Sequence, residues 1–158
     1  SLPEETLGNI RIVFIGQTIE QIKESIPAIL FEKIKDTLLP LGHLDDQDAA
    51  NALAESDIFI CPYIDGANSR RGTLMAAMKL GVPIITCKGK NFESIFRDIP
   101  NISIFDQENI LFKKQFLKAF PVLMENRTNL DKQSMKNSYE TYFSWSRVIE
   151  KYLSSWHK

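Results

Sequence analysis

One stretch of the sequence, residues 63–74, combines two arginines with several groups that can hold an anion. It reads Tyr-Ile-Asp-Gly-Ala-Asn-Ser-Arg-Arg-Gly-Thr-Leu and follows an apolar run that is typical of a buried strand. A helix is expected from residue 70, so its first backbone N–H groups lack helical partners and favour a phosphate. Arg70 and Arg71 can donate paired hydrogen bonds to such an anion, and Ser69 is the expected N-cap. The alternative is a capped surface helix with two solvated arginines.

A second loop, Gly16-Gln17-Thr18, follows the apolar run of residues 10–15. It contains a single glycine and lacks the G-x-G-x-x-G pattern of a dinucleotide site. The chain also lacks a G-x-x-x-x-G-K-[ST] phosphate loop. Gly16 therefore indicates a tight turn between a strand and a helix more than an ordinary dinucleotide site.

Two other charged segments have simple structural explanations. Asp45, Asp46 and Asp48 could bind a cation, but carboxylates at a helix N-terminus account for them more simply. Lys88 and Lys90 could help to hold an anion or could belong to an ordinary charged loop. No spacing of cysteines and histidines resembles a zinc site, and we expect no bound metal.

The two cysteines each end an apolar run. Cys61 and Cys87 are therefore expected to be thiols at strand ends, unpaired, in a reducing compartment such as the cytoplasm. A nucleophilic pair of a cysteine and a histidine stays open, although nothing in the pattern points to one.

Apolar runs alternate with helical patterns along most of the chain. The expected strands are residues 10–15, 37–42, 58–61, 82–86 and 102–105. The expected helices are residues 19–26, 31–36, a segment after Asp45, 70–80, a turn at 92–96, and helices from 107 onward. This order predicts an α/β fold, with a mostly parallel sheet, helices on both faces and a helical C-terminal segment. Right-handed crossovers would bring the Gly16 turn and residues 63–74 to the sheet edge where ligands bind.

Composition limits the classes of function. The 158 residues suit one domain, and 44% hydrophobic with 25% charged residues is ordinary for a globular protein. A net charge of −1 argues against a broad nucleic-acid surface and against a polybasic membrane patch. No apolar run is long enough for a transmembrane helix, and the polar start is unlike a signal peptide. The absence of an initiator Met suggests an excised piece, with residues 1–9 as its linker edge.

Several short motifs occur in a characteristic order. They are Leu-Gly-His-Leu at 41–44, Asp-Ile-Phe-Ile-Cys-Pro at 57–62, Ala-Met-Lys-Leu-Gly-Val-Pro-Ile-Ile at 77–85 and Phe-Ser-Trp at 143–145. Together, over residues 10–152, they resemble the C-terminal, nucleotide-sugar-binding domain of GT-B glycosyltransferases of the group 1 family. The stretch at 77–85 is the most specific match.

The resemblance implies one Rossmann-like domain over residues 1–158, forming half of a GT-B fold. It implies transfer of a sugar from a nucleotide-sugar donor to a glycan, lipid or other acceptor, as in polysaccharide biosynthesis. Such enzymes are cytoplasmic, need no metal or cofactor, and retain the anomeric configuration. The acceptor would bind a missing N-terminal domain, so we expect this chain to bind nucleotide without transferring sugar alone.

The chain departs from the family at a pair of glutamates eight positions apart, which fall here on Asn68 and Ala76. Residues 65–74 instead resemble a variant with Asp-Gly, a serine and two arginines. In that variant Asp65, the candidate catalytic residue, lies near the sugar, and the serine, both arginines and Thr73 face the diphosphate. The predicted substrate-binding residues are Gly16, Gln17, Asp65, Gly66, Asn68, Ser69, Arg70, Arg71, Gly72 and Thr73. The missing glutamates leave open an inactive nucleotide-binding or interaction module.

Overall fold

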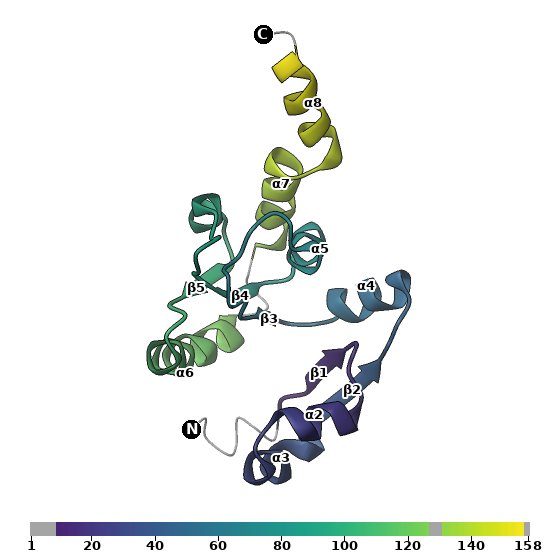
Figure 1. Ribbon diagram of the computed structural model, residues 1–158, viewed down its shortest axis with the longest axis vertical. Coiled ribbons are helices and arrows are strands. Elements are labelled where there is room, and N and C mark those ends of the chain that lie inside the picture. The colour runs from purple at the N-terminus through teal and green to yellow at the C-terminus, as the bar shows by residue number, and fades with distance from the viewer. Residues whose placement is uncertain (1–8, 127–130, 157–158) are drawn as a thin grey trace. The chain divides into compact units, whose positions relative to one another are not determined.

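The computed structural model describes residues 9–126 and 131–156 (Figure 1). Contacts between Cα atoms divide the chain into two compact units, Ser1–Asn51 and Ala52–Lys158. Each unit contains parallel strands joined through helices, as the alternating pattern predicted. The organisation of residues 1–158 as one domain stays a prediction, and the expected linker edge lies outside the described residues except for Asn9.

The first unit pairs two parallel strands, β1 (Ile12–Ile15) and β2 (Leu38–Gly42). Between them along the chain come α2 (Ile19–Ser25), α3 (Ala28–Ile34) and the 3-10 helix η1 (Lys35–Thr37). The helix predicted over 31–36 begins earlier, at Ala28, directly after Pro27. Proline suits the start of a helix because it has no N–H group to leave unpaired there.

Side chains at the starts of α2 and of the helix that follows β2 satisfy free N–H groups. The Thr18 hydroxyl accepts from the Gln21 amide, and the Gln21 side-chain oxygen accepts from the Thr18 amide. α4 (Asp46–Ala54) begins where the Asp45 carboxylate accepts from the Asp48 amide at 2.8 Å. The acidic run therefore acts at a helix N-terminus, as the sequence indicated.

The second unit is built on a parallel sheet with the strand order β3–β4–β5. The strands are β3 (Phe59–Cys61), β4 (Ile84–Cys87) and β5 (Ile102–Phe105), and the helices are α5 (Gly72–Leu80), α6 (Asn109–Asn126), α7 (Lys132–Tyr142) and α8 (Trp145–Trp156). The turn expected at 92–96 is the 3-10 helix η2 (Ser94–Asp98). All four residues of β4 are buried, so both faces of the sheet are covered at this strand.

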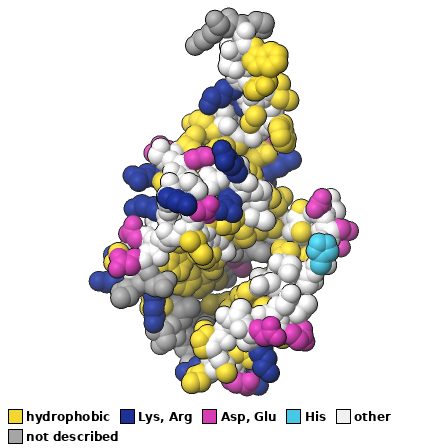
Figure 2. All heavy atoms as spheres, in the orientation of Figure 1, with side chains coloured by type: hydrophobic (Ala, Val, Ile, Leu, Met, Phe, Trp, Pro, Cys, Tyr) yellow, Lys and Arg dark blue, Asp and Glu magenta, His cyan; other side chains and the backbone are white. Residues whose placement is uncertain are grey.

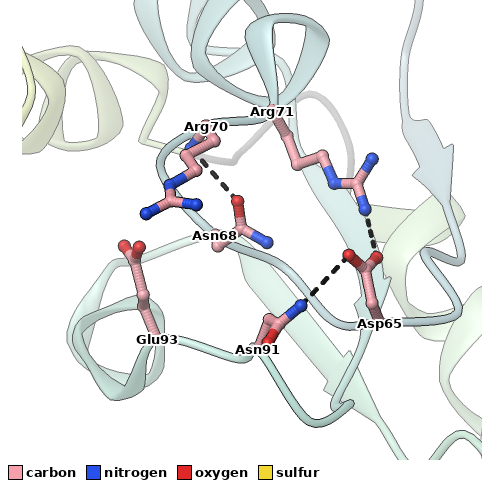
Figure 3. Close-up of a pocket in the computed structure, with 6 residues that line it drawn as sticks. All are labelled: Asp65, Asn68, Arg70, Arg71, Asn91 and Glu93. Carbon is pink, nitrogen blue, oxygen red and sulfur yellow. Dashed lines mark hydrogen bonds and ion pairs between the residues drawn. The ribbon is translucent and has the colours of Figure 1, made fainter.

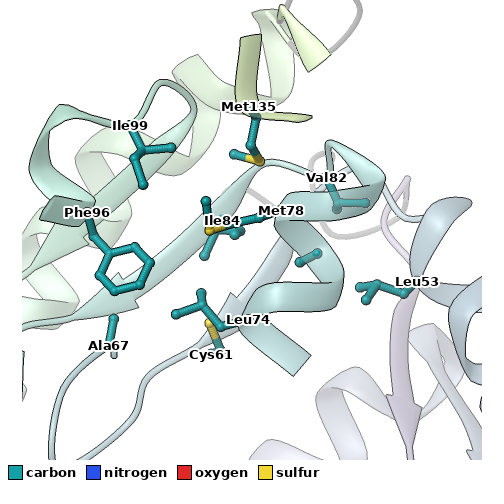
Figure 4. Close-up of a cluster of buried hydrophobic side chains, with 11 residues drawn as sticks. Leu53, Cys61, Ala67, Leu74, Met78, Val82, Ile84, Phe96, Ile99 and Met135 are labelled. Atoms are coloured by element: carbon teal, nitrogen blue, oxygen red, sulfur yellow. The ribbon is translucent and has the colours of Figure 1, made fainter. Parts of the chain in front are cut away.

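The core of the second unit lies on one face of this sheet (Figure 4). Ile84 of β4 packs in a cluster with Leu74 and Met78 of α5 and with Met135 of α7, all of them fully buried or nearly so. Phe96 of η2 belongs to the same cluster. The other face of the sheet is covered by α6. Phe105 of β5 contacts Phe112 of α6, and the ring contacts continue along the helix through Phe116 to Phe120.

α5 differs from prediction at its start and agrees with it at its end. The helix begins at Gly72 with Arg71 as N-cap, so the prediction that Ser69 caps it was wrong. The cause is a turn before the helix, in which the Asn68 side-chain oxygen accepts from the Arg70 amide and the Asn68 carbonyl accepts from the Arg71 amide. Gly81 ends the helix in the left-handed conformation, with φ of 75°.

The C-terminal segment is helical, as expected. α8 carries an apolar face that is exposed over its whole length, and Figure 2 shows hydrophobic side chains along this helix. Its exposed apolar residues are Trp145, Val148, Ile149, Tyr152, Leu153 and Trp156. Across residues 9–126 and 131–156, no helix combines the length and the apolar character that crossing a membrane requires.

Candidate functional site

A polar pocket of about 480 Å³ lies where β3 and β4 end (Figure 3). Its walls come from the loop between β3 and α5 and from the loop between β4 and η2. The lining residues are Asp65, Asn68, Arg70, Arg71, Asn91 and Glu93. The carboxyl ends of parallel strands are the edge at which ligands bind in α/β sheets, so the pocket has the expected location.

Backbone hydrogen bonds join the two loops beyond the ends of their strands. The Ala67 amide donates to the Cys87 carbonyl at 3.2 Å, and the Asn91 amide donates to the Asp65 carbonyl at 2.8 Å. The Glu93 amide then donates to the Ala67 carbonyl at 3.0 Å. The pairing of β3 with β4 thus continues in irregular form, and it holds the pocket's two walls in register.

Two glycines allow this close approach. A Cβ atom on Gly89 would lie 2.4 Å from the carbonyl carbon of Asp65 and equally close to the Gly66 nitrogen. Gly66 also has φ of 95°, a conformation that residues with side chains rarely adopt. Gly66, which was predicted as a binding residue, therefore has a clear structural role in bringing the loops together.

Asp65 is held from two sides. Its carboxylate forms an ion pair with the Arg71 guanidinium, and the Asn91 side-chain amide donates to it at 3.4 Å. The hydrogen bond from Arg71, followed by the one from Asn91, lowers the pKa of Asp65 below its ordinary value. Asp65 is therefore an anion at neutral pH, which suits electrostatic stabilisation and opposes a role as general acid.

Arg71 is also positioned by an aromatic ring. Its guanidinium lies 4.7 Å from the centre of the Tyr63 ring, a cation–π contact. The Tyr63 hydroxyl and the Thr73 hydroxyl are 2.7 Å apart and share a hydrogen bond. Burial raises the pKa of Tyr63, so its hydroxyl stays protonated. Arg71 and Thr73 are thereby tied to one side of the pocket.

Ser69 points to the other side, toward Glu93. The Ser69 amide donates to Glu93 Oε2 at 3.1 Å, and its hydroxyl donates to Oε1 at 3.0 Å. Asn68 between the two walls is 7% exposed, and both ends of its side-chain amide are used, by the Gly66 carbonyl and the Arg70 amide. Asn68 thus orders the loop, with each end of its side-chain amide engaged by the loop's own backbone.

Arg70 is the arginine whose charge is available. Its side chain is exposed, and within the described part of the chain its guanidinium makes no ion pair. In Figure 3 this guanidinium lies on the same side of the pocket as Glu93. Arg70 can therefore reach an anion without breaking an existing contact.

Gly16 and Gln17 belong to the first unit. The Gly16 amide donates to the Gly42 carbonyl at 2.6 Å, and the Gln17 carbonyl accepts from the Gly42 amide at 3.2 Å. Gly16 has φ of 86°, as a tight turn between a strand and a helix requires. Their part in substrate binding stays a prediction.

The remaining chemical candidates are occupied or inert. Lys88 forms an ion pair with Asp106 at 3.2 Å. Cys61 and Cys87 are free and buried, and burial raises the pKa of Cys61 to about 12, so it is no nucleophile at neutral pH. Within the residues that the structure covers, no three His, Cys, Asp or Glu side chains gather as metal ligands would.

Sequence reasoning missed Asn91 and Glu93. They follow β4, the strand next to β3, and the rule that ligands bind at the carboxyl ends of parallel strands pointed to this loop. The sequence analysis applied that rule to the Gly16 turn and to residues 63–74, and in the loop after β4 it considered only Lys88 and Lys90 as possible anion ligands. Ser69, Gly72 and Thr73 are not among the residues that line the pocket; Gly72 and Thr73 lie at the start of α5.

Comparison with known protein families gives a match over most of the chain. The family model described as glycosyl transferases, group 1, covers residues 2–126, more than half of the chain. No curated protein matches the sequence. The matched range includes both walls of the pocket and every strand of the two units.

Proposed function

Because the chain belongs to the group 1 glycosyl transferases, we propose that it is the donor-binding domain of an enzyme that uses a cytoplasmic nucleotide-sugar. The sugar would pass to a glycan, lipid or other acceptor held by a separate N-terminal domain. The observation that carries the proposal is the arginine-containing pocket at the carboxyl ends of β3 and β4. By itself, the chain is expected to bind nucleotide and to transfer no sugar.

In this proposal the diphosphate lies against Arg70 and the start of α5. The free charge of Arg70 and the unpaired N–H groups of the first helical turn stabilise negative charge on the departing nucleoside diphosphate. This stabilisation takes the place of a metal ion, so the proposed reaction uses no resident metal or cofactor. Retention of the anomeric configuration belongs to the same proposal.

Asp65 is the proposed group nearest the sugar. When the bond between the sugar and the nucleoside diphosphate breaks, positive charge develops at the anomeric carbon. An anionic carboxylate nearby stabilises that charge. Arg71 and Asn91 hold Asp65 in one orientation, which avoids reorganisation during the reaction. The ion pair with Arg71 also keeps the carboxylate deprotonated.

A second candidate is a nucleotide-binding module without catalysis. It is favoured by the two positions where the family has glutamates, since neither Asn68 nor Ala76 carries a carboxylate and the Asn68 amide bonds to the backbone of its own loop. The two candidates share nucleotide binding and differ in turnover. Asp65→Asn, assayed for glycosyl transfer together with an acceptor-binding domain, separates them, because only an enzyme loses turnover.

Nucleotide binding is tested by calorimetry with UDP, GDP, ADP and their sugar conjugates. We expect one nucleoside diphosphate to bind, and Arg70→Ala to weaken it at least tenfold, or about 1.4 kcal/mol. Arg147→Ala is the matched control, because Arg147 lies on α8 and pairs with Glu150. Absence of binding by every nucleotide at millimolar concentration, or equal affinity of the Arg70 variant and the wild type, would overturn the proposal.

A further inference from the structure

The carboxylate of Glu93 already occupies two donors that could hold a phosphate. One oxygen accepts from the Ser69 amide at 3.1 Å and the other accepts from the Ser69 hydroxyl at 3.0 Å. An N–H group and an O–H group that converge on paired anionic oxygens would hold two oxygens of a phosphate in the same way. Ser69 thus offers an anion subsite whose present occupant is a side chain of the same protein.

The charges that line the pocket cancel. Arg70 and Arg71 contribute two positive charges, while Asp65 and Glu93 contribute two negative ones. Arg71 is neutralised directly by Asp65, so the remaining balance is between Arg70 and Glu93. A diphosphate that enters near Arg70 therefore meets the like charge of Glu93 on the same side of the pocket (Figure 3).

We infer that the Glu93 carboxylate competes with the diphosphate for Ser69. Nucleotide binding then displaces the carboxylate, and the return of the carboxylate to Ser69 assists release of the nucleoside diphosphate product. This inference rests on the proposed function of the pocket. Glu93 follows Phe92, whose amide donates to the Gly89 carbonyl, and it lies directly before η2. Its backbone is held by Ala67, so displacement needs only side-chain rotation.

The test is Glu93→Gln, with Glu140→Gln as the matched control. Glutamine keeps an oxygen that can accept from Ser69 but removes the negative charge, whereas Glu140 is exposed on α7, outside the pocket lining. Calorimetry compares three probes: the nucleoside diphosphate that the wild type binds, inorganic pyrophosphate and the corresponding nucleoside. We expect Glu93→Gln to bind both phosphate-bearing probes five- to tenfold more tightly, with the nucleoside and the control variant unchanged.

Unchanged or weaker binding of pyrophosphate and nucleotide by Glu93→Gln overturns the inference, because a brace for the loop would give that result. Circular dichroism establishes that each variant is folded. If Glu93→Gln does not fold, Glu93→Ala decides by the same criterion, and unfolding of both identifies a brace. If the wild type binds nucleotide, Arg70→Ala weakens that binding and Glu93→Gln does not strengthen it, this inference is overturned while the proposed function stands. Absence of binding by all proteins overturns the proposed function with it.

Discussion

Asp65 shows how a single residue connects local chemistry to the proposed reaction. The resemblance to the variant motif predicted that Asp65 lies near the sugar. In the structure its carboxylate contacts the side chains of Arg71 and Asn91. The side chains of Asp65 and Arg71 are 31% and 35% exposed, so the ion pair is partly shielded from water. Its main effect is to keep a negative charge in one orientation at the pocket wall.

The ion pair predicts a pH dependence of stability. The pKa of Asp65 is lowered in the folded protein, mainly by Arg71, from about 3.9 in an unfolded chain. Its contribution to the free energy of unfolding is therefore complete above that value and is lost as the pH falls through the folded pKa. We expect the difference in unfolding free energy between wild type and Asp65→Asn to be constant from pH 6 to 8 and to shrink as the pH falls below about 4.

Urea unfolding at each pH measures this difference. Asp98→Asn is the control, because Asp98 is exposed at the end of η2, outside the pocket. If the unfolding free energy of the wild type exceeds that of Asp65→Asn by the same amount down to pH 2, the ion pair is not the source of the difference.

At the scale of elements, the pocket depends on two loops that approach more closely than side chains permit. The contact is between Gly89 and the backbone of Asp65 and Gly66, so neither wall can move independently of the other. The hydrogen bonds of Asn91 and Glu93 to the opposite loop have the same consequence. Positions of the lining groups are therefore set by backbone packing of elements that are distant in sequence.

Gly89→Ala should separate these loops. The added methyl group would overlap backbone atoms, which cannot rotate away, and we expect a loss of about 1–3 kcal/mol in unfolding free energy. Nucleotide affinity should fall as well, because Asp65 and Asn91 lose their register. Urea denaturation and calorimetry measure the two effects.

Gly72→Ala is the control for stability. A Cβ atom at Gly72 meets nothing within 4 Å, and the residue begins α5, so stability should change by less than about 1 kcal/mol. Equal stability of the Gly89 and Gly72 variants would contradict the close approach of the loops.

At the scale of the whole molecule, the two signs of charge are mixed, whereas burial is concentrated in a few elements. The net charge is −1, and Figure 2 shows basic and acidic side chains interspersed on the visible face. Anion binding must therefore come from a few placed groups and not from the surface at large. Burial is concentrated around β4, whose residues are all buried, whereas every residue of α8 is exposed.

Hydrogen exchange should follow this distribution within the unit Ala52–Lys158. Amides of β4 are paired to strands on both sides and covered on both faces, so they should exchange most slowly. Amides of α8 have few buried contacts to protect them and should exchange fastest among the helices of this unit. Mass spectrometry of deuterium uptake measures both, and protection of α8 equal to that of β4 would contradict the expectation.

Most of the helices and strands, and the family, could be predicted from the amino-acid sequence. Runs such as the one that ends in Cys61 show their burial through β-branched and aromatic residues, and Gly81 marks a helix end because a left-handed residue is needed there. The order and spacing of four short motifs, of which residues 77–85 are the most specific, carried the resemblance to group 1 glycosyltransferases, which the family match over residues 2–126 confirms. Each of these features depends on residues that are close together in the chain, so a short stretch of sequence is enough to predict it.

The partners of the pocket residues could not be predicted from the sequence and are known only from the folded structure. Ser69 looked like a helix cap, yet its amide and hydroxyl bind Glu93, 24 residues away in the chain. Asn91 likewise reaches Asp65 across 26 residues. No local pattern encodes these contacts, because they arise when parallel pairing of β3 with β4 brings two loops together and two glycines let their backbones touch. The acid opposite Ser69 is thus a product of the fold, and the distribution of charge in the pocket depends on it.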